Sequence, residues 1–412
     1  MSAPVPRWPH DTLDTRQHTP VPLRQFVLKV HSRCNLDCSY CYIYHSRDGS
    51  WRDRPARADS RTQRAAAARI AEHVVTHGLT RIRVELHGGE PLLGGPGPVL
   101  DYVAAVREAV PASCRVLATV QTNGTLLTEP VLERLHAAGI RVGLSLDGGR
   151  AGHNTRRVDH AGRPAWQAAR AAAGRLAGRP EAYAGILCTI DLAADPVAVF
   201  ESLLELRPPG IDFLLPHGNW DAVPQGLTAG RAPGRHRPDA SPYGDWLVRV
   251  FDAWWDMGGR GTDRGTRVRL FHEIVAVLLG APSAVEAVGL SPLAAIVVET
   301  DGAIEQVDSL KSAYEGAPAT GLDVFRNRFD DALRHPGVAA RQIGERALAE
   351  ECRSCPVGRM CGGGNYVHRY EPHSGFKNPS VYCADLERLI RHVAGRLNHE
   401  LELSKSVPTG CH

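Results

Sequence analysis

The sequence predicts an α/β fold: a partial (β/α)6 barrel of parallel strands, followed by a smaller C-terminal region. Between residues 24 and 217, short apolar runs alternate six times with longer Ala- and Arg-rich amphipathic stretches. This alternation is typical of the strand–helix units that build a parallel sheet. Six units are too few for a closed eight-stranded barrel, so we expect an open one. The length of 412 residues leaves room for a further domain.

The expected strands are short apolar runs bounded by polar turns. They span Phe26–His31, Ile82–His87, Val116–Gln121, Arg141–Leu146, Gly185–Ile190 and Ile211–Leu215. Helices with an apolar period near 3.6 residues are expected between them. They include Thr62–Thr76, Pro130–Ala138, Ala165–Leu176 and Pro196–Leu206. In barrels of this kind the functional loops lie at the carboxyl ends of the strands, so the loops after these six strands are the first place to look for a site.

A Gly-, Pro- and Arg-rich connection at residues 216–244 ends the barrel, as either a flexible linker or an ordered loop that faces a substrate. Helices are expected at Asp245–Met257 and Leu270–Leu279, and the run "IVVETDGAIEQVD" then predicts a strand with a turn. The expected division is an N-terminal extension (1–23), the barrel (24–217), a linker with bridging helices (218–295), a cysteine-bearing domain (296–395) and a tail (396–412).

Composition narrows the function classes. The formal net charge is only +3, from 48 basic and 45 acidic residues, so the chain shows no polyanion-binding signature and we expect no nucleic-acid partner. No run approaches the ~18 apolar residues of a membrane span, and the N-terminus lacks the apolar centre of a signal peptide. We therefore expect a cytoplasmic protein, in which grouped cysteines more often hold metal or do redox chemistry than form disulfides.

The first cysteine group lies in "RCNLDCSYCYIYH", directly after the first expected strand. Cys34, Cys38 and Cys41 are spaced C-x3-C-x2-C. A structural zinc site has four ligands, so three thiols completed by His31 or His45 are a poor match. Three thiolates on a 4Fe–4S cube instead hold three irons and leave the fourth open for a small chelating molecule.

This spacing, with the aromatic Tyr40 before the last cysteine, resembles the signature of the radical SAM superfamily. The resemblance implies that S-adenosylmethionine binds the open iron and, after one-electron reduction, yields a 5′-deoxyadenosyl radical that abstracts a hydrogen atom. The later strand ends resemble the same family: "HGGEP" follows the second strand, "QTNGTLL" the third and "SLDG" the fourth, and "HNTRR" comes next, with Asn154 where the family has aspartate. The residues that the resemblance assigns to S-adenosylmethionine are Tyr40, Gly88, Gly89, Glu90, Asn123, Ser145 and Arg157.

The second cysteine group has four members, with a leading C-x2-C. They are Cys352, Cys355, Cys361 and Cys383. Spacing alone allows zinc or an iron–sulfur cluster. After a radical SAM core, the pattern resembles the SPASM extension, which implies an auxiliary 4Fe–4S cluster. Val307 and Asn365 stand where the full pattern has cysteine, so the resemblance implies a truncated SPASM-type domain with one auxiliary cluster, and two 4Fe–4S clusters in all.

Longer runs resemble the FxsB-type maturases of ribosomally made peptides. They are "DFLLPHGNW", "VVETDGAIEQVDSLKSAYEGAPATGLDVF" and "GGGNYVHRYEPHSGFKNPSVYCADLERLI". This resemblance implies an enzyme that abstracts a side-chain β-hydrogen of a precursor peptide and joins the β-carbon to an aromatic ring, commonly two residues away, in a three-residue cyclophane. It also implies a partner that supplies electrons, a reduced protein of the flavodoxin or ferredoxin type. The alternatives are thioether formation, epimerisation and sulfatase-type formylglycine formation.

The ring loses a proton in such a reaction, which calls for a base. Asp308 follows Val307, and the matching position carries the catalytic aspartate in the sulfatase-maturing SPASM enzymes. The resemblance therefore makes Asp308 the candidate base, acting directly or through water. The alternative is an aspartate that only caps the second strand of the expected hairpin.

Overall fold

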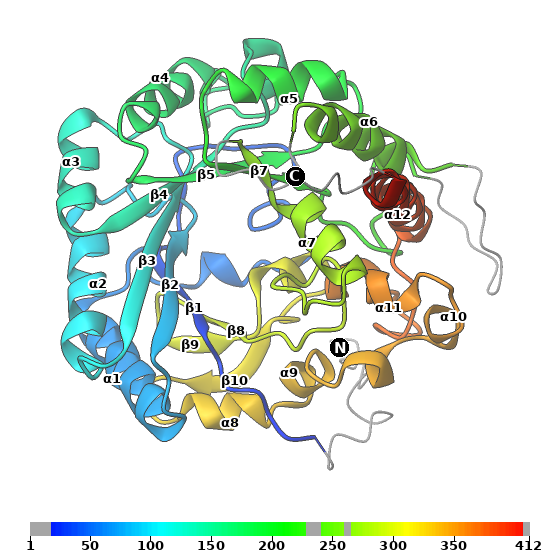
Figure 1. Cartoon of the computed structure of the whole chain (residues 1–412). Helices are drawn as coiled ribbons and strands as arrows, with labels where there is room; N and C mark the ends of the chain where they lie inside the picture. Colours follow the sequence, from blue (N-terminus) through cyan, green and yellow to red (C-terminus); the bar gives the residue numbers. More distant parts are fainter. Residues whose placement is uncertain (1–17, 228–239, 259–264, 407–412) are drawn as a thin grey trace, which may run out of the picture.

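The computed structural model describes residues 18–227, 240–258 and 265–406 of the chain. Its framework is a ten-stranded sheet that curves into an incomplete ring, with helices on the outer side (Figure 1). The strand order is β10-β9-β8-β1-β2-β3-β4-β5-β6-β7. The strands are β1 (Gln25–His31), β2 (Arg81–Gly88), β3 (Arg115–Thr122), β4 (Ile140–Ser145), β5 (Tyr183–Thr189), β6 (Gly210–Leu214), β7 (Arg267–Val268), β8 (Ala295–Val298), β9 (Ala303–Glu305) and β10 (Ala319–Asp323).

The helices fall into two groups along the chain. Five of them alternate with β1–β6: α1 (Ser60–Thr76), α2 (Gly97–Ala109), α3 (Glu129–Ala137), α4 (Trp166–Ala177) and α5 (Pro196–Leu204). The later ones are α6 (Pro242–Asp256), α7 (Arg269–Leu278), α8 (Phe329–Leu333), α9 (Pro336–Ala340), α10 (Glu350–Arg353), α11 (Gly358–Cys361) and α12 (Cys383–Ser406). Short 3-10 turns include η3 (Asp308–Ser312) and η5 (Tyr366–Arg369).

The α/β class and the open barrel are confirmed. Strands β1 to β7 are all parallel to their neighbours, and the six expected strands are present with ends displaced by at most two residues. Helix α2 lies where the strand–helix alternation predicts a helix, although no range was predicted for it, and its start lies in the Gly- and Pro-rich run "GGPGPVL". Proline is tolerated in the first turn of a helix, where the backbone N–H has no intrahelical partner, and α2 begins in this way.

The apolar core lies between the strands and the outer helices. In α1, Ala66, Ile70 and Val74 recur at intervals of four residues and are buried, which places them on one face of the helix. They pack in the same cluster as Phe26 and Leu28 of β1, whose side chains are fully buried. The helix begins after Asp59, whose carboxylate accepts a hydrogen bond from the backbone N–H of Thr62 at 2.7 Å.

The C-terminal region continues the same sheet. Strand β8 pairs in parallel with β1, and β9 and β10 follow as antiparallel neighbours. The turn between β8 and β9 contains Gly302 at φ +85°, a conformation that glycine adopts without steric cost. The expected boundary at residues 295 and 296 therefore runs through one continuous sheet, and the division into domains stays a prediction.

The described part of the connection after β6 is an ordered loop. Asn219 is buried and donates a hydrogen bond to the carbonyl of Ser312 at 2.8 Å. The Trp220 backbone N–H donates to the Tyr370 carbonyl, and its indole N–H to the Pro379 carbonyl at 2.9 Å. These contacts fasten residues 216–227 to the C-terminal region, while residues 228–239 lie outside the described part of the chain.

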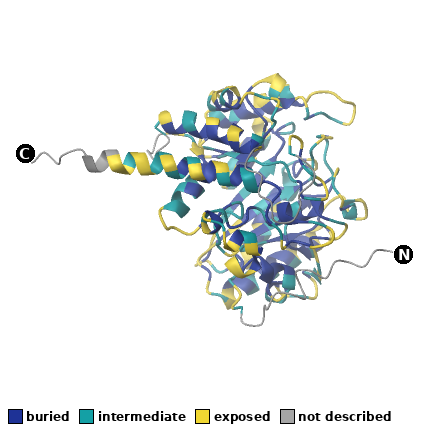
Figure 2. Ribbon diagram, turned by 90° about the vertical axis from the view of Figure 1, so that its right-hand side faces the viewer, coloured by how far each residue is buried: buried dark blue, intermediate teal, exposed yellow. Residues whose placement is uncertain are grey.

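Helix α12 is the longest element. Its N-terminal half packs on α6 and α7 through buried side chains that include Leu386, Leu389 and Val393. Its C-terminal half projects away from the body of the molecule (Figure 2). Among the described helices, none combines the length and apolarity needed to cross a bilayer.

Candidate active site

The first cysteine group lies at the carboxyl ends of the parallel strands, as expected. Cys34, Cys38 and Cys41 line one cavity together with the ends of β2 to β6. Six of the seven residues assigned to S-adenosylmethionine line the same cavity: Tyr40, Gly88, Gly89, Asn123, Ser145 and Arg157. The seven are spread over 118 residues of sequence, and the parallel sheet brings six of them to one place.

Glu90 is the exception, because its carboxylate faces the protein rather than the cavity. The side chain is fully buried. One oxygen accepts from the Thr122 hydroxyl at 2.7 Å and the Leu92 N–H at 3.0 Å, and the other accepts from the Asn123 N–H at 2.8 Å. Glu90 therefore positions the loop after β3, which contains Asn123. This arrangement does not support a direct contact between Glu90 and S-adenosylmethionine.

The three thiols fit a cationic iron–sulfur centre by their chemistry. Burial, Glu90 and the other thiols raise the pKa of Cys34 to about 12, and burial also raises the pKa values of Cys38 and Cys41. The three thiols are partly buried, and thiols that bind metal ions release their protons as they do so, so this group suits a metal centre. The Leu36 N–H donates to the sulfur of Cys34 at 3.4 Å, a contact that favours a thiolate.

Arg157 and Tyr40 form a buried polar group beside the cysteines. Arg157 Nη1 donates to the Tyr40 hydroxyl at 2.6 Å, and that hydroxyl donates to the carboxylate of Asp147. Asp147 also accepts from the Thr189 N–H at 3.1 Å. The Arg157 Nε is buried and has no hydrogen-bond partner in the described part of the chain. Arg157 thus keeps donor capacity that suits a carboxylate. Asp147 was missed, although it stands inside the quoted motif "SLDG".

Gly88 and Gly89 are required by the protein's own chain. A Cβ on Gly88 would lie 2.1 Å from the His31 carbonyl oxygen. A Cβ on Gly89 would lie 1.8 Å from the Tyr44 hydroxyl oxygen and 2.5 Å from the Arg33 carbonyl carbon. The close approach that the two glycines permit is therefore to the cysteine-bearing loop, which they hold against the end of β2.

We expect Gly89→Ala to destabilise the protein by about 3 kcal/mol, because backbone atoms of the cysteine loop would have to move. Thermal unfolding measures the change. Gly97→Ala is the matched control, since a Cβ there meets no atom within 4 Å and it lies at the start of α2. Equal melting temperatures for the two variants would contradict the expectation.

The amide of Asn154 makes hydrogen bonds that the aspartate of the family pattern could not make at this position. Its side-chain oxygen accepts from the Asp147 N–H at 3.0 Å, and its Nδ2 donates to the carbonyls of Gly148 and Arg150 at 2.8 and 2.9 Å. A carboxylate has no donor for two carbonyls. The loop after β4 is therefore built around an amide.

Asn154→Asp should cost about 1–3 kcal/mol of unfolding free energy, since it leaves two carbonyls unpaired beside a buried charge. Chemical denaturation at pH 7.5 measures this. The control is Asn327→Asp. Among the described residues, the Asn327 side chain has one hydrogen bond, which its oxygen accepts from the Asp323 N–H, so we expect a change within about 0.5 kcal/mol. A loss at Asn327 as large as at Asn154 would refute the donor argument.

Asp308 lies next to the cavity, behind His87, which lines it. Its Oδ2 is 2.5 Å from the ammonium of Lys29, and the same ammonium lies 3.2 Å from Nδ1 of His87. The other oxygen, Oδ1, is buried without a hydrogen-bond partner among the described residues. Burial would raise the pKa of Asp308, but the surrounding groups, with the ammonium of Lys29 first among them, outweigh it and lower the pKa.

His87 and Lys29 complete this group. Burial and Lys29 lower the pKa of His87 to about 4, so its imidazole is neutral. Lys29 was missed from the sequence, although a lysine inside the apolar strand run "FVLKVH" is a signal of a buried ion pair. The cavity wall therefore holds a neutral imidazole backed by an anionic carboxylate.

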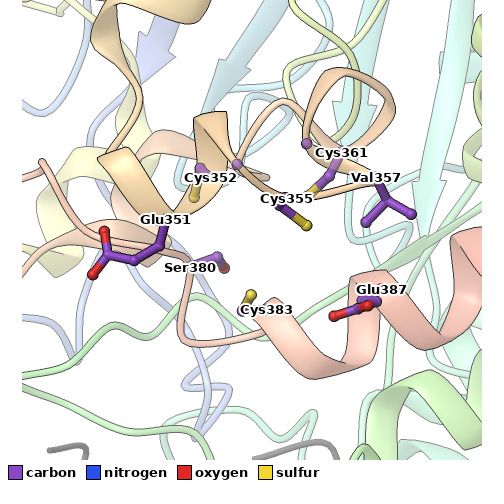
Figure 3. Close-up of a pocket in the computed structure, with 10 residues that line it drawn as sticks. Glu351, Cys352, Cys355, Val357, Cys361, Ser380, Cys383 and Glu387 are labelled. Carbon is purple, nitrogen blue, oxygen red and sulfur yellow. The ribbon is translucent and has the colours of Figure 1, made fainter. Parts of the chain in front are cut away.

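The second group of thiols also converges. Cys352, Cys355, Cys361 and Cys383 line one pocket, and Figure 3 shows their sulfur atoms directed toward a common centre. Burial and the neighbouring thiols raise the pKa of Cys361 to about 11. Four thiols, one buried and three partly buried, come from α10, α11, the turn between them and the start of α12. They suit a closed metal site, so the donor set fits a 4Fe–4S cluster and would also fit zinc.

Apolar and aromatic side chains surround Val307, at the first position without a cysteine. Val307 packs against a cluster that includes Leu310, Tyr366 and Phe376. The rings of Tyr366 and Phe376 stack with centroids 4.4 Å apart. Asn365 directly precedes Tyr366 and uses its backbone carbonyl to accept from the His368 N–H. These contacts are those of a packed core rather than of a metal site.

Comparisons with known proteins agree with this architecture. Residues 28–177 match the Radical SAM superfamily. The serine-type anaerobic sulfatase-maturating enzyme of Klebsiella aerogenes is 24% identical over 359 residues, which cover 86% of this chain and 82% of that enzyme. The cysteine-type anaerobic sulfatase-maturating enzyme of Clostridium perfringens is 22% identical over 380 residues, which cover 91% of this chain and 97% of that enzyme.

A solved structure has the same overall fold. Native anSMEcpe with bound AdoMet superposes with a TM-score of 0.72 at 21% identity, over 93% of this chain and all of that one. The chain therefore carries a radical SAM domain, and the family implies a 4Fe–4S cluster and S-adenosylmethionine. The number of further clusters and the individual ligands stay predictions.

Proposed function

We propose that this chain is a radical SAM enzyme that modifies a ribosomally made peptide by joining a side-chain β-carbon to an aromatic ring nearby. The main support for an oxidation of this kind is the carboxylate of Asp308. It is buried next to His87, which lines the cavity of Cys34, Cys38 and Cys41. An oxidation that removes a hydrogen atom, a proton and an electron needs a proton acceptor beside the place where the radical forms. The choice of a cyclophane rests on the resemblance of the three long runs to FxsB-type maturases.

A 4Fe–4S cluster on Cys34, Cys38 and Cys41, with S-adenosylmethionine bound, would supply the radical that takes the β-hydrogen. The protein's own residues do the rest. The cavity orients the substrate so that the carbon radical reaches the ring, and Lys29 holds Asp308 in its anionic form. After the new C–C bond forms, the ring loses one proton toward Asp308, directly or through water. An iron–sulfur cluster held by Cys352, Cys355, Cys361 and Cys383 would accept the remaining electron.

Sulfatase-type maturation is the second candidate, because sulfatase-maturating enzymes match 86–91% of this chain. In that reaction a cysteine or serine side chain is oxidised to an aldehyde. It also releases one proton and one electron after the hydrogen atom is taken, so the same carboxylate would serve. What differs is the product, which has a free aldehyde and no link between residues.

Co-expression with the short open reading frame beside the gene separates the two candidates. A cyclophane lowers the peptide mass by about 2 Da per ring, blocks fragmentation between an aromatic residue and a near neighbour, and gives no reaction with a hydrazide probe. A reactive aldehyde on a cysteine- or serine-containing peptide would favour sulfatase-type maturation instead. A blocked segment that contains a cysteine would indicate a thioether. An unmodified mass with S-adenosylmethionine still cleaved would reject both candidates and point to epimerisation or another substrate.

A further inference from the structure

Asp308 belongs to a buried network of charged side chains, which we call the carboxylate network. Its members come from β1, the loop after the first cysteine group, the β8–β9 hairpin and η3. They are the carboxylates Asp48, Glu299, Glu305 and Asp308 and the cations Lys29, Arg54 and Lys311. Each side chain is 10% exposed or less. Their charges therefore interact with little screening by water.

Lys311 joins three of the carboxylates. Its ammonium lies 3.2 Å from Glu305, 3.3 Å from Glu299 and 3.6 Å from Asp48. Arg54 contacts the other oxygen of Glu305 at 2.5 Å. Oxygen atoms of Glu299, Glu305 and Asp308 all lie within 4.8 Å of one another. One water molecule bridges a gap of that length between two carboxylates.

The network has one more carboxylate than it has cations. Four ionised carboxylates and three cations leave one uncompensated negative charge, which is costly at this depth. His87 next to Asp308 is neutral at pH 7 and does not balance it. Asp301 contacts Arg54 at 2.6 Å, but it is 39% exposed and solvated. Binding of a single proton therefore makes the network neutral.

The proton goes to the member with the highest affinity for it. Burial and Glu299 raise the pKa of Glu305 to about 7, against the opposing effect of Lys311 and Arg54. The pKa of Asp308 is lowered instead, because Lys29 holds its charge at 2.5 Å. Asp308 is thus anionic and contacts His87 of the cavity wall, while Glu305 contacts Arg54 and Lys311 and binds a proton more tightly.

We infer that the carboxylate network takes up the proton released in each turnover, and that Glu305 rather than Asp308 holds it afterwards. The inference rests on the proposed function, in which a substrate C–H or S–H bond gives its proton to Asp308 and its electron to an iron–sulfur acceptor. The proton moves on to Glu305, and Asp308 returns to its anionic form. Glu305 acts through Asp308, from which it receives the proton, and does not contact the substrate.

The first test needs no substrate. Infrared titration of the holoenzyme follows the carbonyl band of protonated carboxyl groups between pH 5 and 9. We expect a band that titrates near pH 7 in the wild type and is missing in Glu305→Gln. Asp301→Asn is the matched control, because it removes an ion pair with the same Arg54 from the exposed side. Identical titrations of wild type and Glu305→Gln would overturn the inference.

The second test uses the peptide encoded beside the gene. Product formation in the wild type should rise with pH through about 7, as the network loses its proton. The Glu305→Gln variant has equal numbers of carboxylates and cations, so the rise of its rate with pH should move below about pH 6. Because the proton held by Asp308 then has no Glu305 carboxylate to move to, product formation at pH 7.5 should fall ~10-fold. The release of 5′-deoxyadenosine should be unchanged. An unshifted profile would refute the role of Glu305. If the wild type releases no 5′-deoxyadenosine, the proposed function is wrong. The infrared titration then decides by itself whether Glu305 is the carboxyl group that holds the proton.

A second variant covers the case in which Glu305→Gln does not fold. Glu299→Gln removes the neighbouring negative charge that raises the pKa of Glu305. The band of Glu305 should then persist and shift to lower pH. A band that stays near pH 7 in Glu299→Gln would contradict the charge count.

Discussion

The triple substitution Cys34/Cys38/Cys41→Ala is expected to abolish the release of 5′-deoxyadenosine from S-adenosylmethionine completely. Alanine offers no ligand, and the three thiols line the cavity together with six of the seven residues assigned to S-adenosylmethionine. The second thiol pocket is built from α10, α11 and α12 and should keep its metal. Iron should therefore fall from about eight to about four atoms per chain.

Iron analysis, electron paramagnetic resonance and chromatography of the nucleoside measure this outcome. Cys188→Ala is the matched control, because Cys188 is a fully buried thiol of β5 that lies outside both thiol groups. It should retain all the iron and the full rate of cleavage. Cleavage that survives in the triple variant would show that the first cysteine group is not the radical-generating site. Zinc in place of iron at the second pocket would show that the auxiliary site was misassigned.

The second large effect is expected from Asp308→Asn. Removal of the base should slow product formation by about 10²–10⁴-fold. Hydrogen-atom abstraction precedes the proton transfer, so deuterium from a β-deuterated peptide should still appear in 5′-deoxyadenosine. Quantitative mass spectrometry of nucleoside and peptide in the same reaction separates the two steps. Product formation within about twofold of the wild type would show that Asp308 is not the base.

Stability has to be separated from catalysis in this variant. Asn at position 308 leaves the buried ammonium of Lys29 without its carboxylate, which costs about 3–5 kcal/mol. The double variant Lys29→Met/Asp308→Asn removes both charges and should recover most of that stability. It should not recover product formation. Recovery of activity together with stability would mean that the ion pair is structural only.

The sequence predicted the elements whose signals are local. Apolar runs bounded by turns located all six barrel strands, and the cysteine spacings located both thiol groups. The alternation predicted a helix where α2 lies but not its range, because its first turn carries the prolines and glycines that usually mark a loop. Glu90 was assigned to the cofactor because its run "HGGEP" resembles the family motif, yet its oxygens accept from the N–H groups of Leu92 and Asn123.

The parts that could not be predicted depend on contacts between distant residues. Lys29 and Asp308 are 279 positions apart, so neither strand pattern nor spacing pairs them. The same holds for Arg54 with Glu305, 251 positions apart. The carboxylate network exists only because β8 and β9 extend the sheet beside β1, and that pairing has no signature within either segment.

The pairing of β8 with β1 also sets an order of events during synthesis. At roughly 5–20 residues per second, Asp308 leaves the ribosome about 15–55 s after Lys29, from which it is 279 residues away. Throughout that interval the edge of β1 that β8 later covers is open, and the Lys29 ammonium lacks its partner. Long-range strand pairing of this kind folds slowly and exposes chains to aggregation. A fragment that ends before β8 should therefore be insoluble, and expression with slow translation or chaperone support should favour the intact sheet.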